Sequence, residues 1–135
     1  ELISFFSVAY AVLTPLLALL LAREGFAVLL HGMRTEAQRV LASEVLQRLE
    51  VPAWERMQPL AAGQVAHVAT EVLHPGLARL LAVRQVLGLR TPGHSLVKLL
   101  APCAGPAVLV GSYTHPAYRV LMRDVLIARQ MTGLL

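Results

Sequence analysis

Apolar runs of strand length alternate along this chain with segments of helical spacing. Three runs contain no Asp, Glu, Lys or Arg: residues 26–30, 65–69 and 107–110. Unbroken runs of this length are typical of parallel strands that are covered on both faces. Apolar residues recur at helical spacing in five further segments: residues 15–24, 36–49, 75–87, 95–100 and 117–130. The alternation predicts an α/β fold, a parallel sheet with helices on both faces.

Turn residues support several of these boundaries. A Thr-Pro pair, the usual N-cap and first-turn combination, opens the helix at 15–24, and Gly25 follows its end. Gly88 closes the helix at 75–87 in the same way. Residues 51–63 carry two prolines and are expected to be irregular or briefly helical.

The N-terminal segment is uncharged from Leu2 to Ala22, which is long enough to suggest a membrane span. Pro15 interrupts the run, and no basic residue precedes it as in a signal peptide. We therefore predict two abutting buried helices, with a membrane-associated protein as the alternative.

Composition adds a second observation about the surface. Hydrophobic residues make up 56% of the chain and charged residues only 15%, against about 25% in ordinary soluble domains. A domain of this size does not need that much apolar material for its core. The excess points to a partner surface or to a membrane.

Charge is distributed unevenly between the two halves. Residues 1–71 hold five Arg and seven Glu, whereas residues 72–135 hold six Arg, Lys98 and a single acid, Asp124. A surface of one sign concentrates phosphates and other anions around it. The pattern indicates a polyanionic partner, although a modest excess of solvated arginines explains it equally well.

The residues of the common catalytic and metal motifs are missing. The five histidines show no HxxxH or HxH spacing, and there is no GxSxG or CxxC motif. Cys103 is the only cysteine, so the chain can form no internal disulfide, which fits a cytoplasmic protein. We interpret Cys103 as a small packing residue.

Several segments resemble the anthranilate phosphoribosyltransferases. Residues 13–17 (LTPLL) and 28–32 (VLLHG) are similar to the helix, strand and loop that lead to that family's Lys-His-Gly-Asn motif. Residues 74–75 (HP) and 84–91 (RQVLGLRT) resemble its HPA and VRxxLGxRT signatures. The resemblance covers roughly residues 12–135 and implies part of an α/β domain of this superfamily.

The chain departs from the catalytic pattern at important places. Leu30 and Met33 stand where catalytic members carry Lys and Asn, and the Gly-rich loop and the Asp-Glu pair that would hold Mg²⁺ are absent. Residues 92–99 (PGHSLVKL) and 114–116 (THP) are more similar to the YbiB-type proteins. That branch is associated with homodimers and with nucleic-acid binding in place of phosphoribosyl transfer.

The same resemblance implies two domains. Residues 1–11 resemble a helix of the small N-terminal helical domain that forms the dimer interface, and residues 12–135 resemble a partial α/β domain. In relatives a strand and a phosphate loop separate these parts, so the resemblance implies a missing segment. Residues 134–135 would begin a further strand.

Two sets of candidate site residues follow. The first set is expected to contact a substrate or another anion: His31, Gly32, Arg34, Arg84 and Arg90. The second set is expected to hold nucleic-acid phosphates: Arg79, Lys98, Arg119 and Arg123. Structural roles remain open for them, for example Arg84 in a pair with Glu71, or Arg119 and Arg123 on a solvated helix face.

We therefore expect a non-catalytic, cytoplasmic protein that binds nucleic acid through basic residues with little sequence preference. It would be a homodimer without a cofactor and without a membrane partner. The alternative is a phosphoribosyltransferase that uses phosphoribosyl pyrophosphate, Mg²⁺ and an aromatic or nitrogenous acceptor.

Overall fold

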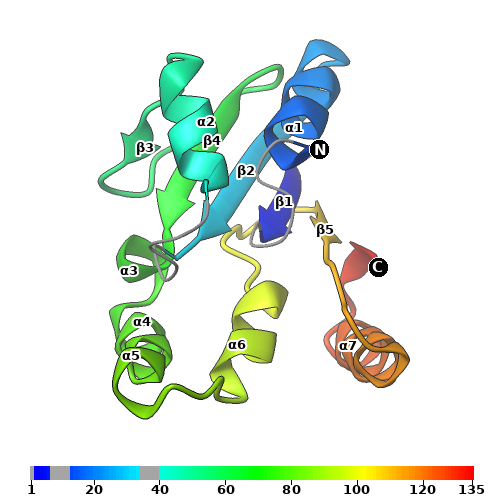
Figure 1. The fold of residues 1–135 in the computed structure, drawn as a ribbon. Coiled ribbons are helices and arrows are strands. Elements are labelled where there is room, and N and C mark those ends of the chain that lie inside the picture. Colours follow the sequence, from blue (N-terminus) through cyan, green and yellow to red (C-terminus); the bar gives the residue numbers. More distant parts are fainter. Residues whose placement is uncertain (1, 7–12, 34–39) are drawn as a thin grey trace.

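A six-stranded parallel sheet forms the centre of the computed structural model, which describes residues 2–6, 13–33 and 40–135 (Figure 1). The strands are β1 (Leu2–Phe6), β2 (Ala27–Gly32), β3 (Ala53–Trp54), β4 (Val65–Ala69), β5 (Ala107–Val110) and β6 (Thr132–Leu134). Their order is β3-β4-β2-β1-β5-β6, and every neighbouring pair is parallel. The predicted α/β fold is confirmed.

Helices and one 3-10 turn connect the strands. They are α1 (Leu13–Arg23), α2 (Ala42–Arg48), α3 (Thr70–Leu73), α4 (Pro75–Ala82), α5 (Arg84–Leu87), α6 (Gly93–Leu96), η1 (Val97–Leu99) and α7 (Pro116–Ala128). In Figure 1, α3 to α6 lie beyond the carboxyl ends of β2 and β4. The connection from β4 to β5 thus builds a layer below the sheet before the chain returns to it.

One face of the sheet is covered by α1 and α2. Ala18 of α1 and Leu46 of α2 are fully buried and belong to the same core cluster as Ile3, Val28 and Leu30. Side chains alternate between the faces of a strand, so Leu2 and Leu29 point to the other side. This core cluster therefore holds α1 and α2 on the same face of the sheet.

The opposite face is covered at its β5–β6 end by α7. A Cβ atom on Gly133 of β6 would come 2.5 Å from Leu126 Cδ1 of α7, and Gly133 pairs with Leu109, whose side chain shares the face of Leu29. In one direction the chain passes from β1 to β2 and then to the outer strands β3 and β4, and in the other direction it passes from β5 to β6. Right-handed crossovers in opposite directions place their helices on opposite faces. Helices on both faces, as expected from the sequence, follow from this topology.

The prediction of a helix within residues 1–11 is wrong for Leu2–Phe6. This segment is a central strand, paired on one side with β2 and on the other with β5. A short apolar run is compatible with a buried strand and with a buried helix. Here β2 and β5 each offer an edge with which the segment pairs, and this pairing makes it a strand. Leu2–Phe6 therefore belongs to the sheet, and a strand does precede the helix that contains the LTPLL sequence.

Other boundaries differ in smaller ways. The helix expected at 75–87 is divided into α4 and α5 at Val83, and α5 ends at Leu87, before the C-cap Gly88, which has a φ of 68°. The first part of the helix expected at 36–49 lies outside the described residues, and the rest is α2. Residues 51–63 contain the short strand β3, which the sequence analysis missed.

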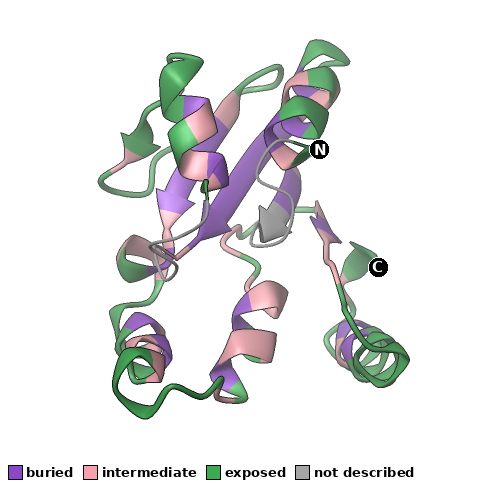
Figure 2. Ribbon diagram, viewed as in Figure 1, coloured by how far each residue is buried: buried purple, intermediate pink, exposed green. Residues whose placement is uncertain are grey.

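Many apolar side chains remain at the surface. Figure 2 shows that exposed residues occur along α1 and cover most of α7. Leu13, Leu16, Leu17 and Leu20 of α1 are 44–60% exposed, and Val86 of α5 is 87% exposed. The apolar excess of the composition is therefore found outside the core. Among the described helices, none has both the length and the hydropathy needed to cross a membrane.

Candidate anion-binding site

His31 and Gly32 directly follow the apolar run at 26–30, where a loop is expected after the strand, but the structure continues the strand through both residues. Both residues belong to β2 and are buried, and His31 is 0% exposed. Burial, together with the nearby His67, lowers the pKa of His31 to about 4, against the opposing effect of a hydrogen bond with the Leu100 backbone. The imidazole is therefore neutral at pH 7 and offers no exposed surface to a phosphate. The third member of this group, Arg34, lies outside the described residues.

The cavity beside Gly32 also lacks the character of an anion site. It has a volume of about 300 Å³ and is lined by Gly32, His67 and Glu71 among others. A neighbouring cavity of about 430 Å³ brings Arg79 together with the same Glu71. A carboxylate opposes the binding of a second anion, so neither cavity is favoured as a phosphate site.

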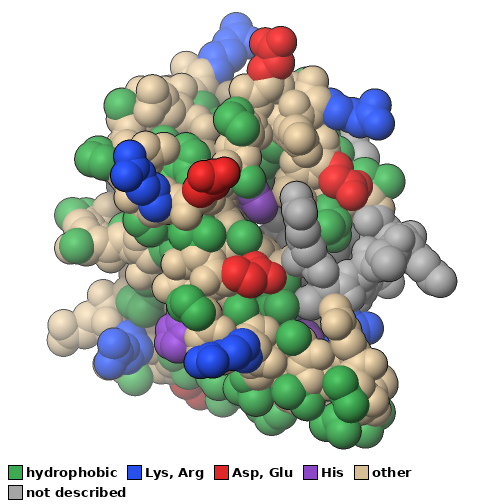
Figure 3. Space-filling model, turned by 90° about the vertical axis from the view of Figure 1, so that its left-hand side faces the viewer, with side chains coloured by type: hydrophobic (Ala, Val, Ile, Leu, Met, Phe, Trp, Pro, Cys, Tyr) green, Lys and Arg blue, Asp and Glu red, His purple; other side chains and the backbone are tan. Residues whose placement is uncertain are grey.

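Acidic and basic side chains are mixed over this side of the molecule. Figure 3 shows the side that carries β3 and α2, where Asp and Glu lie among Lys and Arg. The described residues on this side form no extended patch of one sign.

A basic pocket lies between α6, η1, the loop after β5 and the first turn of α7. It has a volume of about 610 Å³, and its walls include Arg90, His94, Lys98, Tyr113, His115 and Tyr118. Among the residues that the structure describes, no Asp or Glu lines it. We call this the basic pocket below.

The sheet topology explains why a site can form there. The pocket follows the carboxyl end of β5, next to β1, and the crossovers from these two strands run to opposite faces of the sheet. Open parallel sheets hold their ligands in the crevice that opens at such a reversal of strand order. The basic pocket thus occupies the position in which α/β proteins of this kind bind ligands.

Lys98 is held in place within the basic pocket. Its Nζ donates a 2.8 Å hydrogen bond to the carbonyl oxygen of Ser112, in the loop after β5. Partial burial lowers the pKa of Lys98, and the positive charge of Arg90 lowers it further. The two cations are therefore close enough to repel each other, and an anion between them would relieve that repulsion.

His94 is fixed by the turn that precedes α6. Its Nδ1 accepts a 3.2 Å hydrogen bond from the backbone N–H of Thr91. The remaining nitrogen, Nε2, is buried and has no hydrogen-bond partner among the described residues. The ring of His94 therefore brings no negative charge to the basic pocket.

The remaining candidate cations are not gathered in this pocket. Arg84 begins α5 and is half-buried, while Arg119 and Arg123 are exposed on α7. Arg123 donates two hydrogen bonds to Asp124 Oδ1, at 3.0 Å from Nε and 2.8 Å from Nη2. Of the candidates, the structure brings together Arg90 and Lys98, which the sequence analysis had assigned to different sets.

Sequence reasoning missed the aromatic members of the basic pocket. Tyr113, His115 and Tyr118 follow the predicted strand at 107–110 and surround the start of the last helix. Ligand-binding residues of parallel sheets gather after the carboxyl ends of strands. That rule, applied to residues 111–118, would have identified them.

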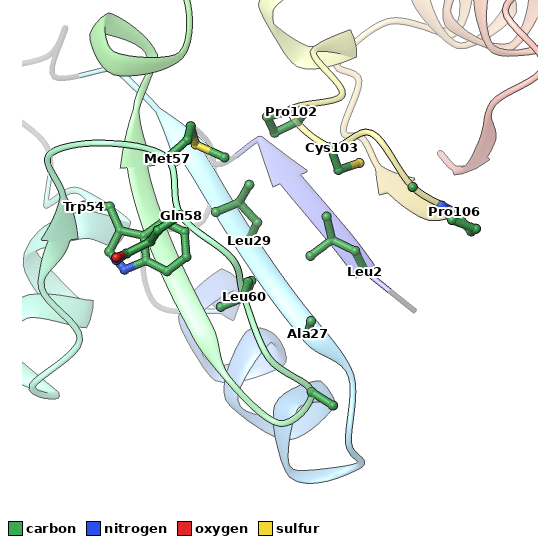
Figure 4. Close-up of a pocket in the computed structure, with 12 residues that line it drawn as sticks. Leu2, Ala27, Leu29, Trp54, Met57, Gln58, Leu60, Pro102, Cys103 and Pro106 are labelled. Carbon is green, nitrogen blue, oxygen red and sulfur yellow. The ribbon is translucent and has the colours of Figure 1, made fainter.

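A second large cavity lies on the open part of the sheet and is apolar. It has a volume of about 630 Å³, and Figure 4 shows Trp54 and Met57 on one side, Pro102 and Cys103 on the other, and Leu29 on its floor. Leu2 and Ala27, the first residues of their strands, also line it, so it lies toward the amino ends of the strands. Burial raises the pKa of the Cys103 thiol, in agreement with a packing role. The cavity is slightly larger than the basic pocket, about 630 Å³ against about 610 Å³, but no charged side chain lines it among the described residues.

The described residues contain no group of three or more His, Cys, Asp or Glu side chains arranged to hold a metal ion.

Comparison with known proteins gives one informative similarity. No family model matches the chain. Over 111 residues the chain is 34% identical to YbiB of Escherichia coli (strain K12), which is described as an uncharacterized protein. The match takes in 78% of this chain, which spans about a third (35%) of the length of YbiB. The chain is therefore similar to YbiB over most of its own length, in agreement with the resemblance seen in its sequence.

Proposed function

We propose that this protein binds nucleic acid through the phosphate backbone, with little sequence preference. The observation that carries the proposal is the pair of cations, Arg90 and Lys98, in a pocket whose described walls hold no carboxylate. Lys and Arg contacts to phosphates supply the sequence-independent part of nucleic-acid affinity.

The charges around the basic pocket support a polyanion over a small neutral ligand. Residues 72–123 contain no acid, and Asp124, which follows them, is paired with Arg123. The amino end of α7 also meets the pocket, at its N-cap His115 and at Tyr118, and the amino end of a helix carries a partial positive charge. The basic residues and the amino end of α7 therefore both contribute positive potential to the basic pocket.

We also infer that the similarity to YbiB reflects a place in the anthranilate phosphoribosyltransferase-like superfamily, in its YbiB-type branch. A cytoplasmic homodimer without a cofactor is part of the same proposal. It is supported by the single cysteine and by the exposed apolar side chains of α1, which leave room for a protein partner.

The alternative, phosphoribosyl transfer, needs cations that grip a sugar diphosphate at the carboxyl ends of the strands. Leu30 stands where catalytic relatives have Lys, and the neutral, buried His31 supplies no charge. Turnover of phosphoribosyl pyrophosphate with Mg²⁺ would nevertheless be a direct demonstration of this activity.

The proposal is tested by the salt dependence of binding. We expect the affinity for a labelled oligonucleotide, measured by fluorescence anisotropy, to fall steeply as salt rises, because bound phosphates release counterions. Lys98→Ala and Arg90→Ala should weaken binding and each reduce the slope of log K against log salt by about 0.7–0.9.

The matched control is Arg56→Ala, which removes the same charge from an exposed residue outside the basic pocket. It should leave the slope unchanged. Binding that is insensitive to salt, or absent at low salt, would rule out the proposal.

A further inference from the structure

Aromatic side chains lie beside the two cations of the basic pocket. Tyr113 is 37% exposed and Tyr118 is 43% exposed, and both line the pocket. The ring of His115 lies 6.1 Å from that of Tyr118, centroid to centroid, at an angle of 45°. Only 5% of the chain is aromatic, so two exposed tyrosines at one site are a concentration that needs an explanation.

Exposed aromatic rings next to cations are suited to one chemistry in particular. A nucleotide offers a phosphate to the cations and the flat face of a base to the rings, and such stacking tolerates any base. In a duplex the faces of the bases are covered by their neighbours in the stack. Rings can therefore distinguish an unpaired strand from a duplex, which arginine and lysine contacts to phosphates do not.

We propose that the basic pocket binds one unpaired nucleotide of a single strand, with its phosphate between Arg90 and Lys98 and its base stacked on Tyr118 or Tyr113. This inference rests on the proposed function and names the kind of nucleic acid that the site selects. The pocket volume of about 610 Å³ lies in the range of small-ligand sites.

The walls of the pocket agree with this occupant in polarity as well as in size. Lys98 Nζ is held at 2.8 Å from the carbonyl oxygen of Ser112, so one cation has a fixed position before any ligand arrives. Leu121 and Met122 of α7 form an apolar part of the wall beside Tyr118, which suits a base better than a second phosphate. A charged end and an apolar, aromatic end within one pocket match the two ends of a nucleotide.

The test compares a mixed-sequence single strand with the blunt duplex of the same sequence, both labelled, at one salt concentration. Tyr118→Ala and Tyr113→Ala are measured beside Tyr118→Phe, which keeps the ring and removes only the hydroxyl. We expect at least one of the alanine variants to lose about fivefold or more in affinity for the single strand, since stacking contributes on this scale. Binding of the duplex should change less than twofold, and Tyr118→Phe should bind like the original protein.

Both tyrosines are exposed, so the variants should fold, and the melting curve by circular dichroism verifies this. The inference would be overturned if the alanine variants lost equal affinity for the single strand and the duplex, or lost affinity for neither. Salt-dependent binding, and with it the proposed function, would remain intact in both cases. Absence of binding to both nucleic acids would remove the proposed function as well.

A free nucleotide is the other source of the same chemistry. AMP, added as a competitor at the same concentration of nucleotide units as the single strand, should displace little of it, because a strand makes further phosphate contacts. Displacement by AMP as effective as by the unlabelled strand would identify a mononucleotide site and overturn the proposal of a strand.

Discussion

Lys98 Nζ donates a 2.8 Å hydrogen bond to the carbonyl oxygen of Ser112, fourteen residues further along the chain. The bond connects η1, which belongs to the layer beyond the sheet, to the loop that follows β5. It closes one wall of the basic pocket and directs a cation to the carboxyl end of the sheet. The same side chain therefore has a structural and a proposed binding role.

Lys98→Met is expected to remove both roles. The variant keeps an unbranched side chain but loses the hydrogen bond to Ser112. Its free energy of unfolding should therefore be about 1–2 kcal/mol lower than that of the original protein. Urea denaturation measures this change. Lys98→Arg can restore a donor and a charge, so it should recover most of the nucleic-acid affinity. An unchanged stability in Lys98→Met would show that the Ser112 contact contributes nothing to the fold.

The buried His31 should make stability depend on pH. The unfolded chain binds a proton at His31 below about pH 6.5, whereas the pKa of His31 in the folded chain is about 4. The contribution of His31 to the free energy of unfolding therefore has its full value above pH 6.5. It falls as the pH drops toward 4, by roughly 3 kcal/mol in total. Denaturation curves of the protein and of His31→Gln between pH 4 and 8 measure the difference. The variant should lose this part of the slope, and identical slopes would contradict the prediction.

Gly133 allows α7 to pack against the edge of the sheet. A Cβ atom at this position would lie 2.5 Å from Leu126 Cδ1 and 3.3 Å from the carbonyl oxygen of Leu109. Gly133→Ala should therefore lower the unfolding free energy by about 1–3 kcal/mol, the usual cost of overpacking. Gly105→Ala is the control, because its Cβ would meet nothing within 4 Å. Equal stabilities of the two variants would contradict the packing of α7 described above.

Cys103 should react slowly with alkylating reagents. Burial raises the pKa of the thiol, so less of the reactive thiolate is present at neutral pH than in free cysteine. We expect alkylation by iodoacetamide to be slower in the folded protein than in urea, with a rate that keeps rising above pH 9. Mass spectrometry follows the modified fraction. A rate in the folded protein equal to that in urea would show that the thiol is not protected.

The exposed leucines of α1 should favour self-association. Leu16 is 52% exposed and Leu20 is 49% exposed, on the same side of the helix, whereas Ala18 is 0% exposed. The double variant Leu16→Glu, Leu20→Glu should fold with stability changed by about 0.5 kcal/mol or less per site and should sediment as a smaller species. Ala18→Glu, in contrast, places a charge in the core and should prevent folding. Sedimentation unchanged in the double variant would exclude α1 as the interface.

The amino-acid sequence by itself determined the fold class and most of the elements. The unbroken runs at 26–30, 65–69 and 107–110 became β2, β4 and β5, because a run that is apolar on both faces is stable only inside a covered sheet. Capping residues such as Gly88, with its positive φ, located helix ends for local reasons. The charge asymmetry was also visible, since it needs no knowledge of the fold.

The tertiary structure alone decided β1 and the basic pocket. Leu2–Phe6 has no local signal that separates strand from helix, and its conformation comes from hydrogen bonds to β2 and β5, which lie far along the chain. Arg90, Lys98 and Tyr118 come from three different segments, and they meet because the strand order reverses between β1 and β5. Periodicity and capping act over a few residues, whereas the pairing of strands acts between distant segments, and the latter determines which side chains share a site.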